Sequence, residues 1–126
     1  MADVTGDIDQ RVDQALEHQR AGSLDKAEAA YRDILSAHPD HAEARHLLGL
    51  VLHQRGAHDA AARELTTAVA LAPGIAQFRF NLGLVETAAG NFENAANTFK
   101  NLIDAGGDAP DLMNAYAVAL RGAGEV

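Results

Sequence analysis

Six histidines are the side chains in this sequence best suited to ligate a metal ion. His46 and His53 share one face of a predicted helix, but their spacing of seven residues separates them by about 10 Å along the helix axis, too far for both to chelate one ion. His38 and His41 lie on either side of a predicted helix break, and His58 begins the next helix. Neither an HExxH motif nor a His-x3-His pair occurs in the sequence. We therefore expect polar, solvated histidines and no metal site.

The sequence offers few candidates for a catalytic nucleophile. It contains no cysteine, and its two serines, Ser23 and Ser36, stand at a predicted helix start and a predicted helix end. Ser23 suits an N-cap position, where its hydroxyl satisfies a free backbone N–H. The glycines at 106–107 and 122–124 lie between or after helices and lack the preceding strand of a phosphate-binding loop. We expect no catalytic residues and no cofactor, and we predict that the chain is not an enzyme.

The charge of the chain argues against a polyanionic partner. Its formal net charge is -8, and 10 basic residues are scattered among 18 acidic ones. Nucleic acids and anionic membranes bind clustered Lys and Arg, so neither is expected as a partner. The sequence contains no run of about 18 apolar residues and starts without the basic and apolar segments of a signal peptide. It therefore predicts a cytoplasmic protein.

The composition predicts an interior made of small side chains. Hydrophobic residues make up 48% of the chain and aromatic residues only 5%, and alanine is abundant throughout. Helices with short side chains pack closely, and three prolines in 126 residues leave room for long helices. The predicted fold class is all-α.

A period of 34 residues organises the whole sequence. The residues that recur at this spacing are Gly22, Gly56, Gly90 and Gly124; Ala27, Ala61 and Ala95; Tyr31, Leu65 and Phe99; and Pro39 and Pro73. The glycines suit helix ends that turn back in a left-handed conformation, and the prolines end a second helix. The alanines allow two helices to cross closely, while the large residues fill the space behind the crossing. This agreement indicates a tandem repeat of helical hairpins.

The repeat predicts helices joined by short turns. Their expected ranges are 8–21, 24–37, 41–55, 58–71, 75–89, 92–104 and 109–122. Asp7 and Asp40 each precede a Gln or Glu by three residues, which predicts capping boxes at the first and third helices. At the last helix, Asp108 is the predicted cap and Pro110 lies in the first turn.

Two segments of the sequence resemble the tetratricopeptide repeat. They are Leu48-Gly49 … Gly56 … Ala61 … Leu65 … Pro73 and Asn81-Leu82-Gly83 … Gly90-Asn91-Phe92 … Ala95 … Phe99. The resemblance implies an α-α superhelix, a solenoid of seven helices in antiparallel hairpins. The implied units are a flexible tail at 1–7, repeats at 8–41, 42–75 and 76–109, and the first helix of a fourth repeat at 110–126. The first unit departs most from the family, because Arg11, Gln14 and His18 are polar, as expected of a helix facing water.

The resemblance also implies a binding groove, because the first helices of successive repeats line the concave side of such a superhelix. The side chains predicted to bind a partner there are Glu43, His46, Leu50, His53, Gln77, Phe80, Asn81, Leu84 and Asn114. An apolar floor and an acidic rim that includes Asp111 favour a peptide or protein segment with apolar residues and a basic one. Phe80 is the expected anchor, unless its ring folds against the neighbouring helix as part of the core.

An acidic chaperone tail is not the expected ligand. Family members that bind such tails carry a carboxylate clamp of Lys, Asn and Arg, whereas Val12, Leu16, Leu47 and Asn81 stand at those positions here. Asn81 resembles the asparagine that some members use to hold a ligand's backbone, but only one repeat carries it. The main function predicted is therefore protein–protein interaction through the groove.

Two alternatives accompany this prediction. Bacterial chains with a segment similar to 38–49 often precede glycosyltransferase-like or sulfotransferase-like domains, so the chain is alternatively a substrate-docking arm of such an enzyme. The predicted helix 109–122 keeps apolar residues beyond the face that covers the previous unit. This fits either a fragment of a longer protein or a self-associating scaffold, with a homodimer through this helix.

Overall fold

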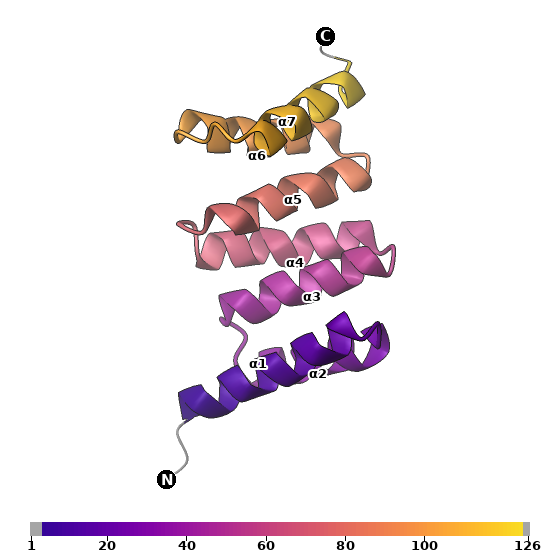
Figure 1. Cartoon of the computed structure of the whole chain (residues 1–126), viewed down its shortest axis with the longest axis vertical. Coiled ribbons are helices and arrows are strands. Elements are labelled where there is room, and N and C mark those ends of the chain that lie inside the picture. The colour runs from indigo at the N-terminus through magenta and orange to yellow at the C-terminus, as the bar shows by residue number, and fades with distance from the viewer. Residues whose placement is uncertain (1–3, 125–126) are drawn as a thin grey trace.

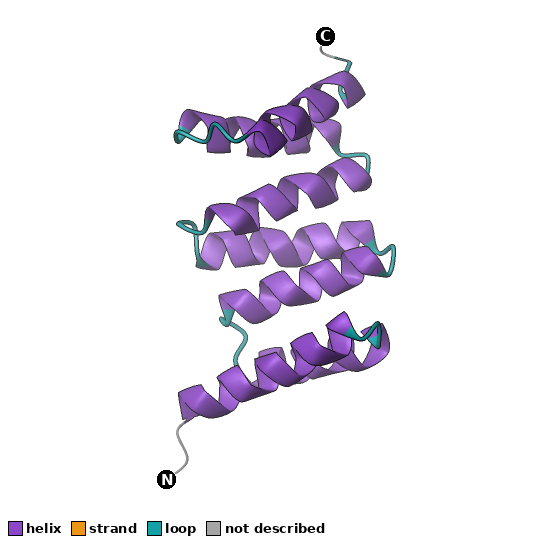
Figure 2. Ribbon diagram, viewed as in Figure 1, coloured by secondary structure: helices purple, strands orange, loops and turns teal. Residues whose placement is uncertain are grey.

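The computed structural model describes residues 4–124, which form seven helices stacked as successive antiparallel hairpins (Figures 1 and 2). The helices are α1 (Val4–Arg20), α2 (Leu24–Ala37), α3 (Ala42–Gln54), α4 (His58–Leu71), α5 (Ala76–Ala88), α6 (Phe92–Asp104) and α7 (Pro110–Gly122). Each helix packs mainly against its neighbours in sequence, so the hairpins follow one another along the long axis and α7 lies at one end. The predicted all-α solenoid is confirmed.

The turns inside the hairpins use the glycines of the repeat. Gly22, Gly56 and Gly90 have φ angles of 81, 84 and 82°, in the left-handed region that glycine enters without a steric cost. After α1, the Ser23 N–H donates to the His18 carbonyl at 2.8 Å, which satisfies the last helical turn. Equivalent bonds close α3 and α5. The glycine period therefore marks the end of each first helix.

The end of α6 breaks the period. The helices α2 and α4 end at Ala37 and Leu71, each followed two residues later by a proline. In contrast, α6 ends at Asp104, one residue earlier in the repeat, and turns through Gly106 with φ of 105°. Gly107 occupies the register of the two prolines. The connection from α6 to α7 therefore follows a different path from the two earlier ones.

The first helix starts earlier than predicted. It begins at Val4, so Asp7 lies inside the first turn and is not a cap. The predicted tail of residues 1–7 is therefore helical from Val4 onward, while residues 1–3 lie outside the described part of the chain. Ser23 does occupy the N-cap position of α2, as predicted, although its side chain makes no capping hydrogen bond.

Two further predicted caps are wrong, because a neighbouring residue takes each position. The start of α3 is capped by His41, whose Nδ1 accepts a hydrogen bond from the Ala44 N–H at 3.0 Å. An imidazole nitrogen thus replaces the predicted carboxylate of Asp40. At α7 the N-cap is Ala109, so Asp108 precedes the cap, and proline takes the first helical position as predicted.

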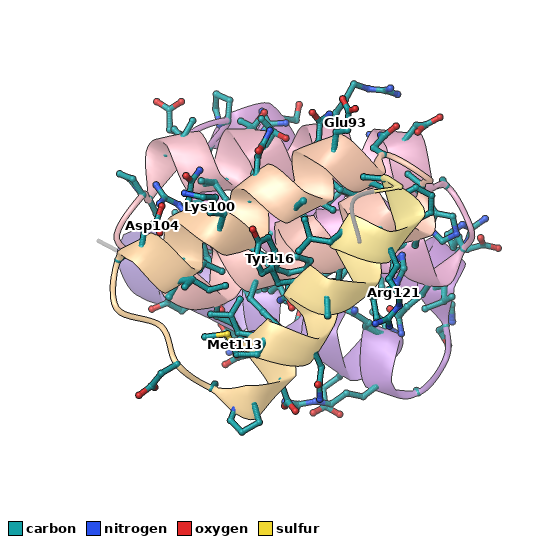
Figure 3. All side chains as sticks on the ribbon, turned by 90° about the horizontal axis from the view of Figure 1, so that it is seen from above. Glu93, Lys100, Asp104, Met113, Tyr116 and Arg121 are labelled. Carbon is teal, nitrogen blue, oxygen red and sulfur yellow. The ribbon has the colours of Figure 1, made fainter. Side chains whose placement is uncertain are left out.

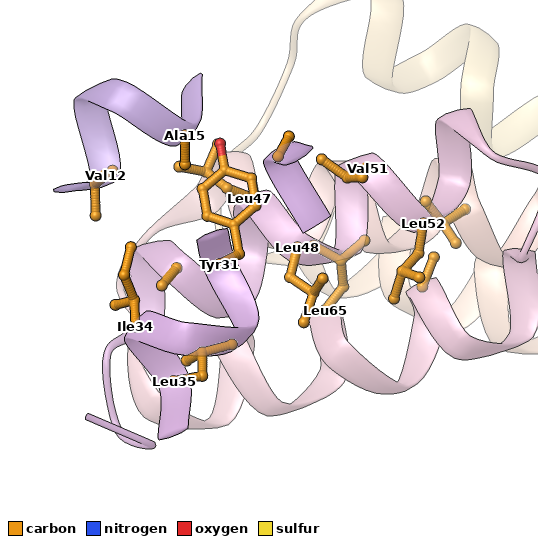
Figure 4. Close-up of a cluster of buried hydrophobic side chains, with 14 of the residues drawn as sticks. Val12, Ala15, Tyr31, Ile34, Leu35, Leu47, Leu48, Val51, Leu52 and Leu65 are labelled. Carbon is orange, nitrogen blue, oxygen red and sulfur yellow. The ribbon is translucent and has the colours of Figure 1, made fainter. Parts of the chain in front are cut away.

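The predicted helix crossings are confirmed. The residues with no exposed surface at these crossings are Ala27, Ala61, Ala95, Tyr31, Leu65 and Phe99. The first helix of a hairpin approaches through glycine, since a Cβ added to Gly49 would lie 2.7 Å from Leu65 Cγ. A Cβ on Gly83 would lie 2.4 Å from Phe99 Cε1. Figure 4 shows Tyr31 and Leu65 among the buried side chains of the first hairpins.

Most of the buried apolar side chains among residues 4–124 belong to one of two clusters. One extends from α1 to α5 and includes Tyr31, Leu48 and Val85. The other joins α6 to α7 around Phe99 and Leu112, and Phe80 of α5 packs partly buried against it. Helix α5 therefore contributes to both clusters.

The outward face of α1 is polar, as predicted. Gln14 and Glu17 are exposed at positions where α3 buries Leu48 and Val51 against the preceding hairpin. Inner helices therefore carry apolar residues on this face, whereas α1 faces water with polar ones.

Candidate functional site

The residues predicted to bind a partner belong to α3, α5 and α7. These helices and α1 form one side of the stack, which we call the odd-helix face (Figure 1). Leu16 and Leu50 are half-buried in it, whereas Leu84 and Val118 are 41% and 44% exposed. These four residues share one register of the repeat, so the apolar row becomes more exposed toward α7. A row of exposed apolar side chains is a typical protein-interaction feature.

The polar residues predicted for this site are divided between surface and interior. Glu43, Gln77 and Asn114 are exposed on α3, α5 and α7. Asn81 is half-buried, and its Oδ1 accepts a hydrogen bond from Gln77 Nε2 at 3.1 Å. Asn81 therefore already has a partner within its own helix.

His46 lies inside the interface between α3 and α5 instead of on the open surface. Its side chain is 8% exposed, and its ring stacks on Phe78 with centroids 4.2 Å apart and planes 19° apart. Asn81 Nδ2 donates to His46 Nε2 at 2.8 Å, so this nitrogen accepts and the neutral ring carries its proton on Nδ1. Burial lowers the pKa of His46, which favours this neutral form.

His53 forms a pair that sequence spacing did not reveal. Its Nδ1 lies 2.9 Å from Nδ1 of His58, and the ring centroids are 4.9 Å apart. Burial and then the neighbouring His58 lower the pKa of His53. The two residues lie at the end of α3 and the start of α4, so the turn at Gly56 brings them together. Among residues 4–124, no group of three or more His, Asp or Glu side chains is placed to hold a metal ion.

A cavity of about 440 Å³ opens beside Phe80, between the start of α5, the end of α6 and the start of α7. Its other main lining residues are Gln77, Leu102, Ala105, Asp108, Asp111 and Leu112. Phe80 is half-buried, and its ring meets Phe99 at a centroid distance of 5.9 Å with the planes tilted by 55°. The ring is thus both part of the core and a wall of the cavity.

The last helix also leaves apolar surface uncovered. Leu112 and Ala119 of α7 are buried, but Met113 is 40% exposed. Seen from above, α7 lies beside α6 with Tyr116 between the two helices (Figure 3).

On α6, Lys100 donates to Asp104 at 2.9 Å, and this hydrogen bond raises the pKa of Lys100.

Glu86 is a buried carboxylate that the sequence analysis did not single out. Only 9% of the residue is exposed, and its Oε1 accepts a hydrogen bond from Thr98 Oγ1 at 2.7 Å. Burial raises the pKa of Glu86, although the bond from Thr98 acts in the opposite direction. The matching positions in the second and fourth units are Leu52 and Leu120, and only the first unit carries another polar residue there, His18. The departure of Glu86 from these leucines was the available signal.

The sequence is similar to one protein family along most of its length. The tetratricopeptide repeat model matches residues 12–75, 58–110 and 80–126. The chain belongs to the tetratricopeptide repeat family. A comparison with proteins of curated function gave no match. No helix in the described part of this tetratricopeptide repeat chain is long and apolar enough to cross a membrane.

Solved structures with tetratricopeptide repeats show how far the similarity extends. A mutant of the Thermobaculum terrenum O-GlcNAc transferase is 34% identical with a TM-score of 0.81, and the match covers 95% of this chain but 23% of the transferase chain. The Sgt2 TPR domain from Aspergillus fumigatus is 16% identical with a TM-score of 0.83, over 94% of this chain and 80% of that domain. The first TPR of Spaghetti (RPAP3), bound to the HSP90 peptide SRMEEVD, is 14% identical with a TM-score of 0.85, over 93% of each chain. The last two likenesses concern the fold alone.

Proposed function

We propose that this chain is a protein-interaction module that binds an extended peptide segment along the odd-helix face. The observation that carries the proposal is the exposure of Leu84 and Val118, 41% and 44%, in one row with the half-buried Leu16 and Leu50. Contact between these side chains and an apolar segment would remove their surface from water. The exposed Glu43, Gln77 and Asn114 would supply polar contacts at the edges of this row, and their binding role stays a prediction.

The charge of the odd-helix face favours a peptide with basic residues. Glu43 and Asp111 are exposed on it, and the position of Leu47 is apolar where a carboxylate clamp would need a cation. The neighbour bound to the peptide SRMEEVD is similar in fold only, at 14% identity, so its ligand is not transferred to this chain. We expect peptides rich in Asp and Glu to bind weakly here, because like charges repel.

A displayed library of random peptides, selected against the chain, tests the proposal. We expect selected peptides to lose about tenfold or more of their affinity when Leu84→Asp or Val118→Asp places a charge in the apolar row. The matched control is Ala29→Asp on the exposed surface of α2, which should leave affinity unchanged. Equal losses in the control, or peptides that ignore all three changes in a folded protein, would refute the odd-helix face as the binding surface.

A docking arm of a glycosyltransferase-like enzyme is the second candidate. It is favoured by the 34% identity to the O-GlcNAc transferase of Thermobaculum terrenum, of which this chain spans 23%. The first test is the genomic sequence that follows the codon for Val126. A transferase-like domain in the same reading frame supports the candidate, and deleting residues 4–124 should then impair glycosylation of protein substrates more than that of a short acceptor. A stop codon would exclude it.

Self-association through α7 is a third candidate, favoured by the 40% exposure of Met113 on this helix. Light scattering across a dilution series from micromolar concentration should then report a dimer that Met113→Lys converts to a monomer. A monomer at every concentration would exclude it.

A further inference from the structure

Two junctions between successive hairpins occupy equivalent places in the repeat but are filled by different side chains. Where α3 meets α5, the ring of Phe78 stacks on His46 at 4.2 Å, and both side chains are buried. Where α5 meets α7, the residues in the same register are Leu112 and Phe80. Leu112 has no ring to place over Phe80, which instead tilts against Phe99. A cavity of about 440 Å³ is lined by Phe80 and Leu112, the residues in the registers of the stacked pair of the preceding junction.

The connection before α7 keeps this space open. Ala105 stands at the register of Leu71, so a methyl group replaces a larger side chain at the rim. The turn through Gly106 brings Gly107 against Leu112, since a Cβ added to Gly107 would lie 2.7 Å from Leu112 Cδ2. Gly107 and Leu112 therefore pack closely at the wall of the cavity, where a larger residue than glycine would displace Leu112.

The opening of the cavity is acidic. Asp108 and Asp111 are exposed and line it, and no Lys or Arg does so. The ion pairs found within the described residues involve neither carboxylate. A ligand that fills the apolar interior would therefore meet two carboxylates at the entrance, and a cation next to the filling group is the complementary partner.

We propose that this cavity holds one Leu or Met side chain of a bound peptide whose adjacent residue is Lys or Arg. The inference rests on the proposed peptide-binding function and specifies the anchor and its neighbouring charge. The volume accommodates an aliphatic side chain together with part of its backbone, and Phe80, Leu102 and Leu112 supply the apolar wall. The exposed row at Leu84 then carries the remainder of the segment.

Three blocked hexapeptides test the anchor. The probe is acetyl-Gly-Ser-Leu-Arg-Gly-Ser-amide, compared with versions in which Arg is replaced by Glu or Leu by Ala. Titration followed by the amide NMR signals of Phe80 and Leu112 should show the Leu-Arg peptide binding about fivefold or more tightly than either comparison peptide. Its affinity should fall as salt rises, because the carboxylates are exposed to solvent.

Two substitutions narrow the cavity with the larger residues that stand in the same registers of the preceding repeat. Ala105→Leu copies Leu71, and Leu112→Phe copies Phe78. Each substitution should lower the affinity for the Leu-Arg peptide about tenfold. Because Ala105 is exposed, its variant keeps the fold even if Leu112→Phe does not. The matched control is Ala37→Leu, at the same register in the first repeat, which should leave binding unchanged.

The double variant Asp108→Asn with Asp111→Asn tests the role of the two charges. It should bind the Arg and Glu peptides with equal affinity, while the peptide with Leu should still bind more tightly than the peptide with Ala. Signal shifts confined to Leu84 and Val118, insensitive to Ala105→Leu, would overturn the anchor and leave the odd-helix face as the binding surface. Preference for the Glu peptide would also overturn the proposal, as would unchanged signals at millimolar peptide. In that last case the library selection still decides separately whether the face binds peptides.

Discussion

Successive copies of the 34-residue repeat form two equivalent junctions, one between α3 and α5 and one between α5 and α7. The side chains that fill the two junctions differ. The first is closed by an aromatic stack and by hydrogen bonds from Gln77 through Asn81 to His46. The second holds a cavity with two carboxylates at its opening. The repeat therefore constrains the helix crossings, while the junction positions vary in residue type. They fill the interface in one unit and leave a cavity in the next, where we propose that a peptide side chain binds.

The largest expected effect comes from removing the ring of Phe78 at the junction between α3 and α5. Phe78→Ala should lower the free energy of unfolding by about 3 to 4 kcal/mol, because it leaves a void against His46 and an unstacked ring. Leu112→Ala should cost about 2 kcal/mol, since its side chain already borders a cavity and has fewer contacts to lose. Urea unfolding followed by the helical signal measures both. Equal losses would show that the two junctions are packed alike.

Acidification should destabilise the junction between α3 and α5, where His46 is buried, and should leave the junction between α5 and α7 unchanged. Burial lowers the pKa of His46, so the unfolded chain binds the proton more readily than the folded one. The stabilisation is complete above about pH 6.5, the ordinary value for histidine, and is lost as pH falls below it toward the depressed pKa. The expected loss between pH 7.5 and 5 is on the order of 1 kcal/mol.

The variant His46→Phe, which copies Phe80, isolates this effect. It should flatten the pH dependence of the unfolding free energy, whereas His53→Gln removes only the part that comes from the lowered pKa of His53. If the unfolding free energy of His46→Phe still fell with acidification as in the unmodified chain, His46 would not be the group responsible for the pH dependence.

The smallest expected effect concerns α5, the helix that both junctions share. Burial raises the pKa of Glu86, so its stabilising contribution is present below about pH 4.5 and is lost as pH rises through the raised pKa. Glu86→Gln keeps an oxygen to accept from Thr98 and should stabilise the fold at pH 7 by less than about 1 kcal/mol. The gain should disappear at pH 4. The exposed Glu17→Gln on α1 serves as the control and should change stability little at either pH, because its ion pair with Arg20 is exposed to solvent.

The sequence was sufficient for positions that obey the same constraint in every repeat. Ala61 and Leu65 could be assigned to a crossing because only a small residue followed by a large one fits there, and both are fully buried. The turn at Gly56 was equally accessible, because its left-handed φ restricts the residue type.

The site could be predicted only in part, because junction positions vary in type. Ala44, Phe78 and Leu112 share one register, and nothing in the spacing says which of them fills its junction. The burial of His46 follows from Phe78, a residue on another helix that lies in no simple sequence relation to it. The cap predicted at Asp40 is wrong for a local reason, since the next residue, His41, accepts the hydrogen bond from the Ala44 N–H instead.

The division of the buried side chains into two clusters bears on how the chain opens. The cluster of α6 and α7 joins the rest of the chain through α5, at Phe80, at Gly83 against Phe99 and at the hydrogen bond from Thr98 to Glu86. Because the cluster from α1 to α5 does not extend beyond α5, we expect α6 and α7 to be able to open while that cluster stays closed. Amide hydrogens of α7 should then exchange with deuterium sooner than those of α3. A peptide side chain in the cavity would bridge this unit to α5 and slow that exchange, so recognition and local order would be coupled in a single event.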